Sequence, residues 1–201
     1  MKKERPILFS TPMVKAIDLG AKTKTRRTTK LEVINQRPEA YSLIGSEILN
    51  GKLIFKFNKH CGEGGVVDVV FPYGLIGDVL WVRECFRKIQ CGYAYKANPG
   101  VIFKNQSMSF TEIDSSWKPS IHMPKRIARL WLEIINVTAE PLQKITDKEA
   151  CLEGVETLEI ISGFNISPKT KFEMLWNIIN GESAFDENPW VWVIEFKQIK
   201  K

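Results

Sequence analysis

The sequence has no long apolar run and no apolar stretch at its start. No segment of its 201 residues approaches the eighteen or so consecutive apolar residues of a membrane-spanning helix. The first residues, Met1 to Pro6, are mostly charged and lack the apolar region of a signal peptide. These absences argue against a membrane-spanning or secreted protein, so we expect a cytoplasmic one.

Cysteine and histidine are also scarce. The four cysteines, Cys61, Cys85, Cys91 and Cys151, show no Cys-x-x-Cys spacing, and we expect them to be reduced and partly buried. His60 precedes Cys61, but no second pair of ligands follows at the spacing of a zinc site. The sequence therefore predicts neither a bound metal nor a cofactor.

Positive charge is in excess and is clustered. The formal net charge is +6, and the segment from Lys22 to Lys30 holds five lysines and arginines and no acidic residue. A second group consists of Lys125, Arg126 and Arg129. Such clusters attract phosphate groups and speed association with polyanions. Threonines between the cations of the first cluster favour a phosphate-facing role, and an ordinary solvated basic face is the alternative.

Three helices are predicted from the residues at their ends. The first runs from Thr11, an N-cap candidate followed by proline, to Gly20. A capping box, Thr-x-x-Glu, opens a short helix from Thr146 that ends near Gly154. The third begins at Ser167, carries apolar residues at helical spacing and ends at Gly181.

Segments rich in β-branched and aromatic residues predict the strands. They cover residues 7–9, 53–57, 66–71, 79–86, 127–137 and 190–196. The second and third of these form a hairpin across a glycine-rich turn. Because strands and helices do not alternate as βαβ units, the pattern indicates an α+β barrel rather than a parallel sheet. We expect a single domain, 1–201, without internal repeats.

The segment from Leu19 to Arg27 has the greatest chemical interest. The predicted helix ends at Gly20, which leaves Lys22 in a loop and lets Thr25 enter a strand. A lysine can act as the base for a nearby hydroxyl when burial or neighbouring cations lower its pKa. From these residues alone, a solvated basic loop is the better interpretation.

This segment resembles the Gly-x-Lys-Thr-x-Thr-x-Arg signature of the ASCH family, whose members are related to the PUA RNA-binding domains. The turn and strand from Gly77 to Glu84 resemble the family's GD-x-L-x-V pattern, and the capping-box helix and the closing strand follow in the expected order. The chain is most similar to the longer ASCH proteins of bacteriophages and prophages, with further likeness at 72–74, 117–124 and 188–193. The resemblance implies a PUA-like β-barrel with flanking helices, and insertions around 31–65, 98–118 and 155–167.

One branch of that family is implied to remove the acetyl group from 4-acetylcytidine. Its catalytic lysine, threonine and glutamate match Lys22, Thr25 and Glu153. In those roles Thr25 attacks the amide carbonyl, Lys22 takes its proton, and Glu153 orients Lys22 or the exocyclic amine. The expected partner is a nucleoside or RNA. The alternatives are a non-enzymatic RNA-binding phage factor acting in the bacterial cytoplasm and a metal-independent ribonuclease.

Further residues are candidates for contacts with a base or a phosphate. Trp81 and Arg83 share one face of a predicted strand, where they could present a cation beside an aromatic surface, although Arg83 could equally form an interstrand ion pair. Trp117 could stack on a base or fill the barrel end. A lone histidine such as His122 is more often structural, but it lies in a segment of the phage-like pattern. The predicted binding residues are Lys24, Arg26, Arg27, Trp81, Arg83, Trp117, His122 and Arg126.

Overall fold

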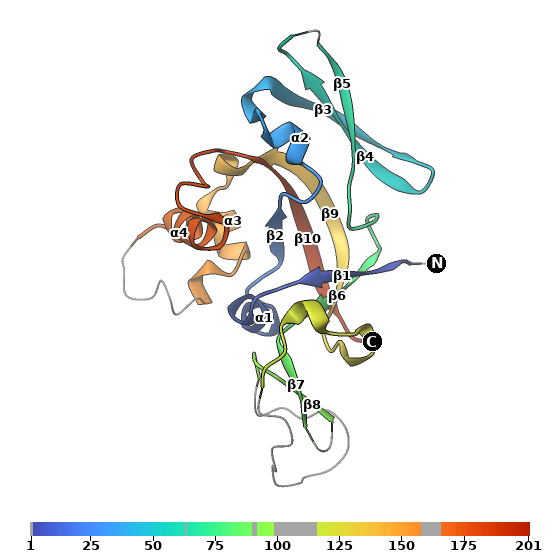
Figure 1. Cartoon of the computed structure of the whole chain (residues 1–201), viewed down its shortest axis with the longest axis vertical. Coiled ribbons are helices and arrows are strands. Elements are labelled where there is room, and N and C mark those ends of the chain that lie inside the picture. The colour runs from blue at the N-terminus through green and yellow to red at the C-terminus, as the bar shows by residue number, and fades with distance from the viewer. Residues whose placement is uncertain (1, 63, 90–91, 99–115, 158–165) are drawn as a thin grey trace.

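The chain combines α-helices with a larger number of β-strands (Figure 1). The computed structural model describes residues 2–62, 64–89, 92–98, 116–157 and 166–201. The α-helices are α1 (Thr11–Asp18), α2 (Glu32–Asn35), α3 (Asp147–Leu152) and α4 (Pro168–Asn180). The strands are β1 (Glu4–Leu8), β2 (Lys24–Arg27), β3 (Tyr41–Leu49), β4 (Lys52–Lys59), β5 (Gly65–Val70), β6 (Val79–Arg83), β7 (Phe86–Ile89), β8 (Gly92–Tyr95), β9 (Trp131–Pro141) and β10 (Trp190–Ile199).

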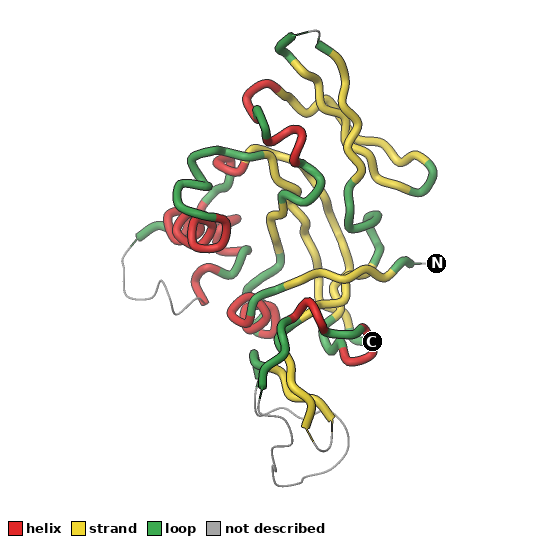
Figure 2. The backbone as a smooth tube through the Cα atoms, viewed as in Figure 1, coloured by secondary structure: helices red, strands yellow, loops and turns green. Residues whose placement is uncertain are grey.

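The largest sheet has five strands in the order β1-β6-β9-β10-β2. Its pairs are antiparallel except β1 and β6, which run parallel. Figure 2 draws the strands in yellow, in the same view as Figure 1. A three-stranded sheet, β3-β4-β5, and the hairpin β7-β8 complete the β-structure of the described residues. The mixture of helices and strands is confirmed, but β1 and β2 remain the two edges of the large sheet. The described residues therefore form no closed barrel.

Strand β10 is buried on both faces because its side chains alternate between two clusters. Trp190, Trp192, Ile194 and Phe196 belong to the main core, which extends to α1 and to the three-stranded sheet. The side chains between them, such as Val191 and Val193, pack with α3 and α4. A period of two residues places these sets on opposite faces of the strand. The helices α3 and α4 thus cover one face of the large sheet, as Figure 1 shows.

The segment 31–65, expected as an insertion, contributes to the main core. Ring centroids of Phe57 and Trp190 lie 5.1 Å apart, and those of Phe55 and Trp192 lie 4.9 Å apart. The predicted hairpin is confirmed as the antiparallel pair β4 and β5. Strand β3, which was not predicted, precedes it through a turn at Asn50 and Gly51, both with positive φ.

The three predicted helices are present, with one difference at a cap. The N-cap of α1 is Ser10 rather than Thr11, so the proline occupies the second helical position. Thr146 and Glu149 form the predicted capping box of α3, and the Ser167 side chain caps α4. The predictions therefore located these helices to within one or two residues.

Two predicted strands have different limits in the structure. The strand predicted at 127–137 begins only at Trp131, because Lys125–Ile127 forms a 3-10 turn that follows a proline. The strand predicted at 79–86 is divided between β6 and β7, which lie in different sheets. Of the other expected insertions, residues 99–115 and 158–165 lie outside the described ranges.

Three of the four cysteines lie in the described residues. Cys85 and Cys151 are half-buried free thiols, whereas Cys61 is exposed, unlike the expected partial burial. Cys91 lies outside the described ranges. None of the described helices has both the length and the apolar character needed to cross a membrane.

Candidate functional site

The chain that leaves α1 runs alongside the end of α3. Gly20 has φ 71°, a left-handed conformation that lets the chain turn sharply after the helix. Lys22 then forms an antiparallel bridge with Glu153, and the Thr23 amide donates to the Leu152 carbonyl at 2.9 Å. Lys22 and Glu153 are 131 residues apart in the sequence, and these contacts hold their two segments side by side.

Lys22 is buried at this junction, where three oxygen atoms surround its ammonium. Nζ donates to the Glu153 carboxylate at 2.7 Å, to the Glu153 carbonyl at 2.9 Å and to the Lys24 carbonyl at 2.9 Å. Burial lowers the pKa of Lys22 below its ordinary value, while the charge and hydrogen bond of Glu153 act in the opposite direction. The pair is a candidate for proton transfer because it combines deep burial with a charged partner.

Arg26 extends this cluster to three carboxylates. Its guanidinium lies 3.2 Å from Glu153, 2.8 Å from Glu140 and 3.1 Å from Glu149. Burial alone would raise the pKa of Glu149, but Arg26, the Thr146 amide and Lys24 together hold it below its ordinary value. The sequence suggested a phosphate contact for Arg26. In the structure its side chain is buried and its charge is already neutralised by these acids.

Thr25 is fully buried on β2. Residues 25 and 27 lie on the same face of a strand, and the Arg27 guanidinium lies 5.0 Å from the centroid of the Phe9 ring. The Lys22 Nζ is 5.7 Å from the same ring. Thr25 Oγ1 is buried without a hydrogen-bond partner in the described part of the chain. The structure thus joins Lys22 directly to Glu153 but does not hydrogen-bond either side chain to Thr25.

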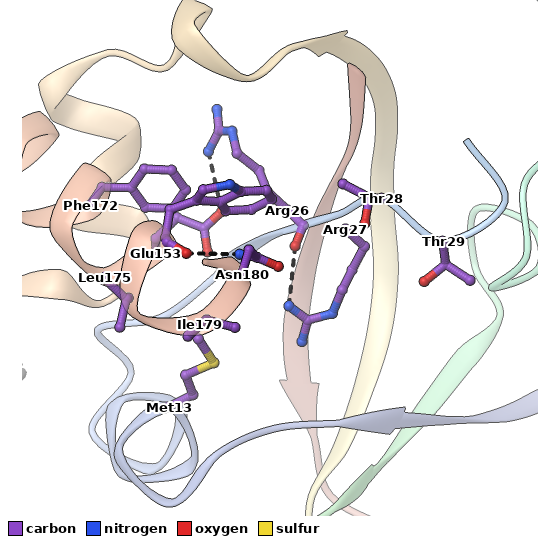
Figure 3. Close-up of a pocket in the computed structure, with 11 residues that line it drawn as sticks. Met13, Arg26, Arg27, Thr28, Thr29, Glu153, Phe172, Leu175, Ile179 and Asn180 are labelled. Atoms are coloured by element: carbon purple, nitrogen blue, oxygen red, sulfur yellow. Dashed lines mark hydrogen bonds and ion pairs between the residues drawn. The ribbon is translucent and has the colours of Figure 1, made fainter. Parts of the chain in front are cut away.

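A cavity of about 190 Å³ lies beside this cluster, between β2 and α4 (Figure 3). Of the three proposed catalytic residues, Glu153 is the one among its described lining residues. The apolar part of the lining consists of Met13, Phe172, Leu175, Trp176 and Ile179. The polar part consists of Arg26, Arg27, Thr28, Thr29 and Asn180. Aromatic surface with a few directed polar groups is typical of a small-molecule site.

Two of the predicted binding residues border this cluster without being fully buried. Arg27 lines the cavity and donates to the Arg26 carbonyl at 3.1 Å and to the Leu8 carbonyl at 2.9 Å. Lys24 is half-buried, and its ammonium lies 3.3 Å from Glu149. Arg27 is therefore placed to contact a ligand, whereas Lys24 already has an acidic partner.

The other predicted binding residues are not among the described residues of the cavity lining. Trp81 and Arg83 do share a face, with the guanidinium 5.6 Å from the Trp81 ring centroid, but Arg83 donates to the carbonyls of Ser120 and Ile121. Arg83 thus tethers the segment that carries the remaining three. Those three are Trp117, half-buried with the Arg87 guanidinium 4.9 Å from its ring, and the exposed His122 and Arg126.

Acidic residues largely neutralise the second basic group. Arg129 forms a two-pronged pair with the buried Glu84, at 2.7 and 3.0 Å, and also pairs with Asp18 at 3.0 Å. Burial raises the pKa of Glu84, and Arg129 opposes that shift. Lys125 pairs with Glu4. This region is therefore better explained as structural pairing than as a phosphate surface.

Several residues of the site were not predicted from the sequence. Glu140 and Glu149 neutralise Arg26, while Asn180 and Trp176 line the cavity. Glu149 is the glutamate of the predicted capping box, and Trp176 is one of the apolar residues at helical spacing in the third predicted helix. The spacing of Trp176 and Asn180, i and i+4 on α4, was the available signal that both lie on one side of that helix.

Gly154 allows the close approach of α1, Lys22 and the end of α3. A Cβ at this position would lie 2.8 Å from Ala16 Cβ and 3.1 Å from Lys22 Cβ, and φ is +81°. We expect Gly154→Ala to lower the free energy of unfolding by about 2–4 kcal/mol, because strain and steric overlap add. The control is Gly20→Ala, where φ is similar but no atom lies within 4 Å. Equal losses in urea unfolding would contradict the packing argument.

Comparison of the chain with models of protein families, with curated proteins and with solved structures found no match. Within the described ranges, no group of three histidine, cysteine, aspartate or glutamate residues is placed to hold a metal ion. The Lys22–Glu153–Arg26 cluster and the cavity beside it form the candidate functional site.

Proposed function

We propose that this chain is an ASCH-type protein that binds a pyrimidine nucleoside, free or within RNA, and removes an acyl group from its exocyclic amine. One observation supports this most strongly. Glu153, fixed between the buried cations Lys22 and Arg26, faces a cavity of about 190 Å³ that also has aromatic lining residues. A PUA-like fold belongs to the same proposal; the five-stranded sheet, which is open at β1 and β2, would be the counterpart of its barrel.

The buried charges of Lys22, Glu153 and Arg26 favour a functional role for this cluster over a purely structural one. Burying an ion pair costs several kcal/mol of desolvation per ion, and a well-packed apolar set of the same volume is often at least as stable. Here two cations hold one carboxylate at the edge of a cavity. Glu153 can accept a hydrogen bond from an exocyclic amine, and Phe172 and Trp176 offer apolar surface to a base.

The reaction assigns a distinct role to each residue. Thr25 Oγ attacks the acyl carbonyl, its proton passes to neutral Lys22, and the exocyclic amine leaves as it takes that proton. Water then hydrolyses the acyl ester on Thr25, so that the net products are the nucleoside and a carboxylic acid. The lowered pKa of Lys22 favours the neutral form that this step requires. Lys22 must also release one of its three present acceptors, and Thr25, which is fully buried and not among the described lining residues, must become accessible to the acyl carbon.

A specific observation also favours a second function, binding without catalysis. All three ammonium protons of Lys22 are donated to oxygens other than the Thr25 hydroxyl. An ammonium held in this way is a structural cation, and the cavity beside it would then serve only to recognise a base. The two functions differ in whether acyl release occurs.

The deciding experiment follows release of free cytidine from 4-acetylcytidine by chromatography, without added metal. The wild-type protein is expected to release cytidine, and Lys22→Met, which removes the base, is expected to lose at least about a hundredfold in turnover. Lys171→Met is the matched control, because Lys171 pairs with Glu156 outside the cavity lining. If the wild type released no cytidine from a series of acylated cytidines, the hydrolase would be rejected and binding without catalysis would be the remaining function.

A further inference from the structure

A second cavity has a strongly positive lining. It has a volume of about 220 Å³, and its charged lining residues in the described part of the chain are Arg5, Lys30 and Lys52. No carboxylate is among those lining residues. The site described above differs in this respect, since each of its buried cations faces at least one carboxylate.

Three separate parts of the fold bring these cations together. Arg5 lies on β1, Lys30 lies in the turn after β2 with φ 67°, and Lys52 begins β4. The turn at Asn50 and Gly51 leads directly into Lys52 and contributes Gly51 to the lining. Because β1, β2 and β4 belong to two different sheets, the cluster exists only in the folded chain.

The three side chains have no ion pair within the described residues, in contrast to Arg26 and Arg129. Arg5 Nε is buried and lacks a hydrogen-bond acceptor there. Asp78 lies close to Arg5, because a Cβ added at Gly74 would be 2.9 Å from Arg5 Nε and 2.4 Å from Asp78 Oδ2. However, Asp78 already accepts from the Lys3 and Leu75 amides. With the charge of Asp78 counted, the three cations Arg5, Lys30 and Lys52 still leave this region with an excess of positive charge.

This cavity is next to the Glu153 cavity along the chain. Thr28 and Thr29 line the first cavity, and Lys30 lines the second. The Thr29 hydroxyl lies 3.2 Å from the Tyr73 hydroxyl, and Tyr73 adjoins Pro72 and Gly74 of the second lining. The linings of the two cavities thus contain the adjacent residues Thr29 and Lys30, so one cation of the second cavity directly follows a wall residue of the first.

We infer that the cavity of Arg5, Lys30 and Lys52 binds a phosphate group of the ligand whose base occupies the Glu153 cavity. The inference rests on the proposed function for the position of the base. Guanidinium and ammonium groups are the usual protein partners of phosphate oxygens. The substrate class is then a nucleotide, alone or within an RNA strand, rather than a free nucleoside.

The test compares cytidine, cytidine monophosphates and a short cytidine-containing RNA as ligands in calorimetric titrations. The wild-type protein is expected to bind at least one phosphorylated ligand about tenfold more tightly than cytidine, as hydrogen bonds to charged groups allow. Lys30→Gln/Lys52→Gln should remove this preference and leave cytidine binding unchanged. The charge-matched control is Lys88→Gln/Lys200→Gln, two exposed lysines outside the described lining of both cavities.

The outcomes separate this inference from the proposed function. A preference for phosphate that is lost in the cavity variant, with no acyl release from any substrate, would support the phosphate site and reject the hydrolase. Acyl release with equal affinity for cytidine and all phosphorylated ligands would support the hydrolase and reject the phosphate site. An equal loss of affinity in the control variant would show that general charge attraction, and not this cavity, holds the phosphate.

Discussion

Glu153→Gln is expected to lower the free energy of unfolding by about 3–5 kcal/mol, the range for breaking a buried ion pair. Each carboxylate oxygen of Glu153 accepts from a different cation, Oε2 from Lys22 at 2.7 Å and Oε1 from Arg26 at 3.2 Å. A glutamine offers one acceptor oxygen and one amide group. The amide would face a cationic donor, so one buried cation would lose its partner.

The control for this prediction lies in the same cluster. Glu140 contacts Arg26 at 2.8 Å, but its side chain keeps 24% of its exposure to solvent. Glu140→Gln retains an oxygen acceptor and should cost less than about 1 kcal/mol. Urea unfolding of the two variants measures both values. Similar small losses would mean that Glu153 is not held as a buried anion between two cations.

Thr25→Val is expected to abolish acyl release while the protein stays folded. Valine keeps the shape of threonine but lacks the hydroxyl that attacks the acyl carbon, so turnover should fall by at least about a thousandfold. Because Thr25 Oγ1 is buried without a described hydrogen-bond partner, its removal should leave the free energy of unfolding unchanged or raise it by about 1 kcal/mol. Turnover and the free energy of unfolding are thus expected to change independently of each other.

Parallel assays of Thr23→Val control for the change from threonine to valine. Thr23 lies in the same segment, where its backbone pairs with Leu152, and it is absent from the described cavity lining. This variant should retain turnover. Equal turnover by the wild type and Thr25→Val would remove Thr25 as the nucleophile, and a large loss of stability in Thr25→Val would show that its hydroxyl has a structural partner.

Helix ends were readable from the sequence because their signals are local. Thr146 and Glu149 satisfy each other's amides within one turn, and Ser167 caps the helix that follows it. Such contacts need no information from distant parts of the chain. The helix end at Gly20 was predicted from the glycine. The burial of both faces of β10 was not predicted, because it depends on packing against distant segments.

Strand β3 was missed although a local signal was present. Asn50 and Gly51 both have positive φ, and an Asn-Gly pair between two strand-like segments is a strong hairpin signal. The exposed residues of β3 lack the regular apolar alternation on which the strand predictions depended. The parallel pair of β1 and β6 was also unexpected, since these strands are separated by more chain than one βαβ unit requires.

The chemistry of the basic segment was only partly predictable. Lys22 and Glu153 were selected through a family resemblance, and the structure brings them to 2.7 Å. The positive charge along the segment suggested that Arg26 faces phosphate. Its acidic partners Glu140 and Glu149 lie 114 and 123 residues away in the sequence, so the composition of the segment does not reveal them. Ion pairs between distant segments cannot be recognised from local composition. A buried, ion-paired arginine and an exposed, unpaired arginine are therefore indistinguishable in the sequence.

A crystal structure of Thr25→Val with 4-acetylcytidine tests the central claim most directly, because the variant should bind this ligand without consuming it. The account predicts the pyrimidine ring in the cavity between β2 and α4, with its acylated amine toward Glu153 and its sugar toward Thr28 and Thr29. An empty cavity at saturating ligand, or a base bound elsewhere on the chain, would contradict it.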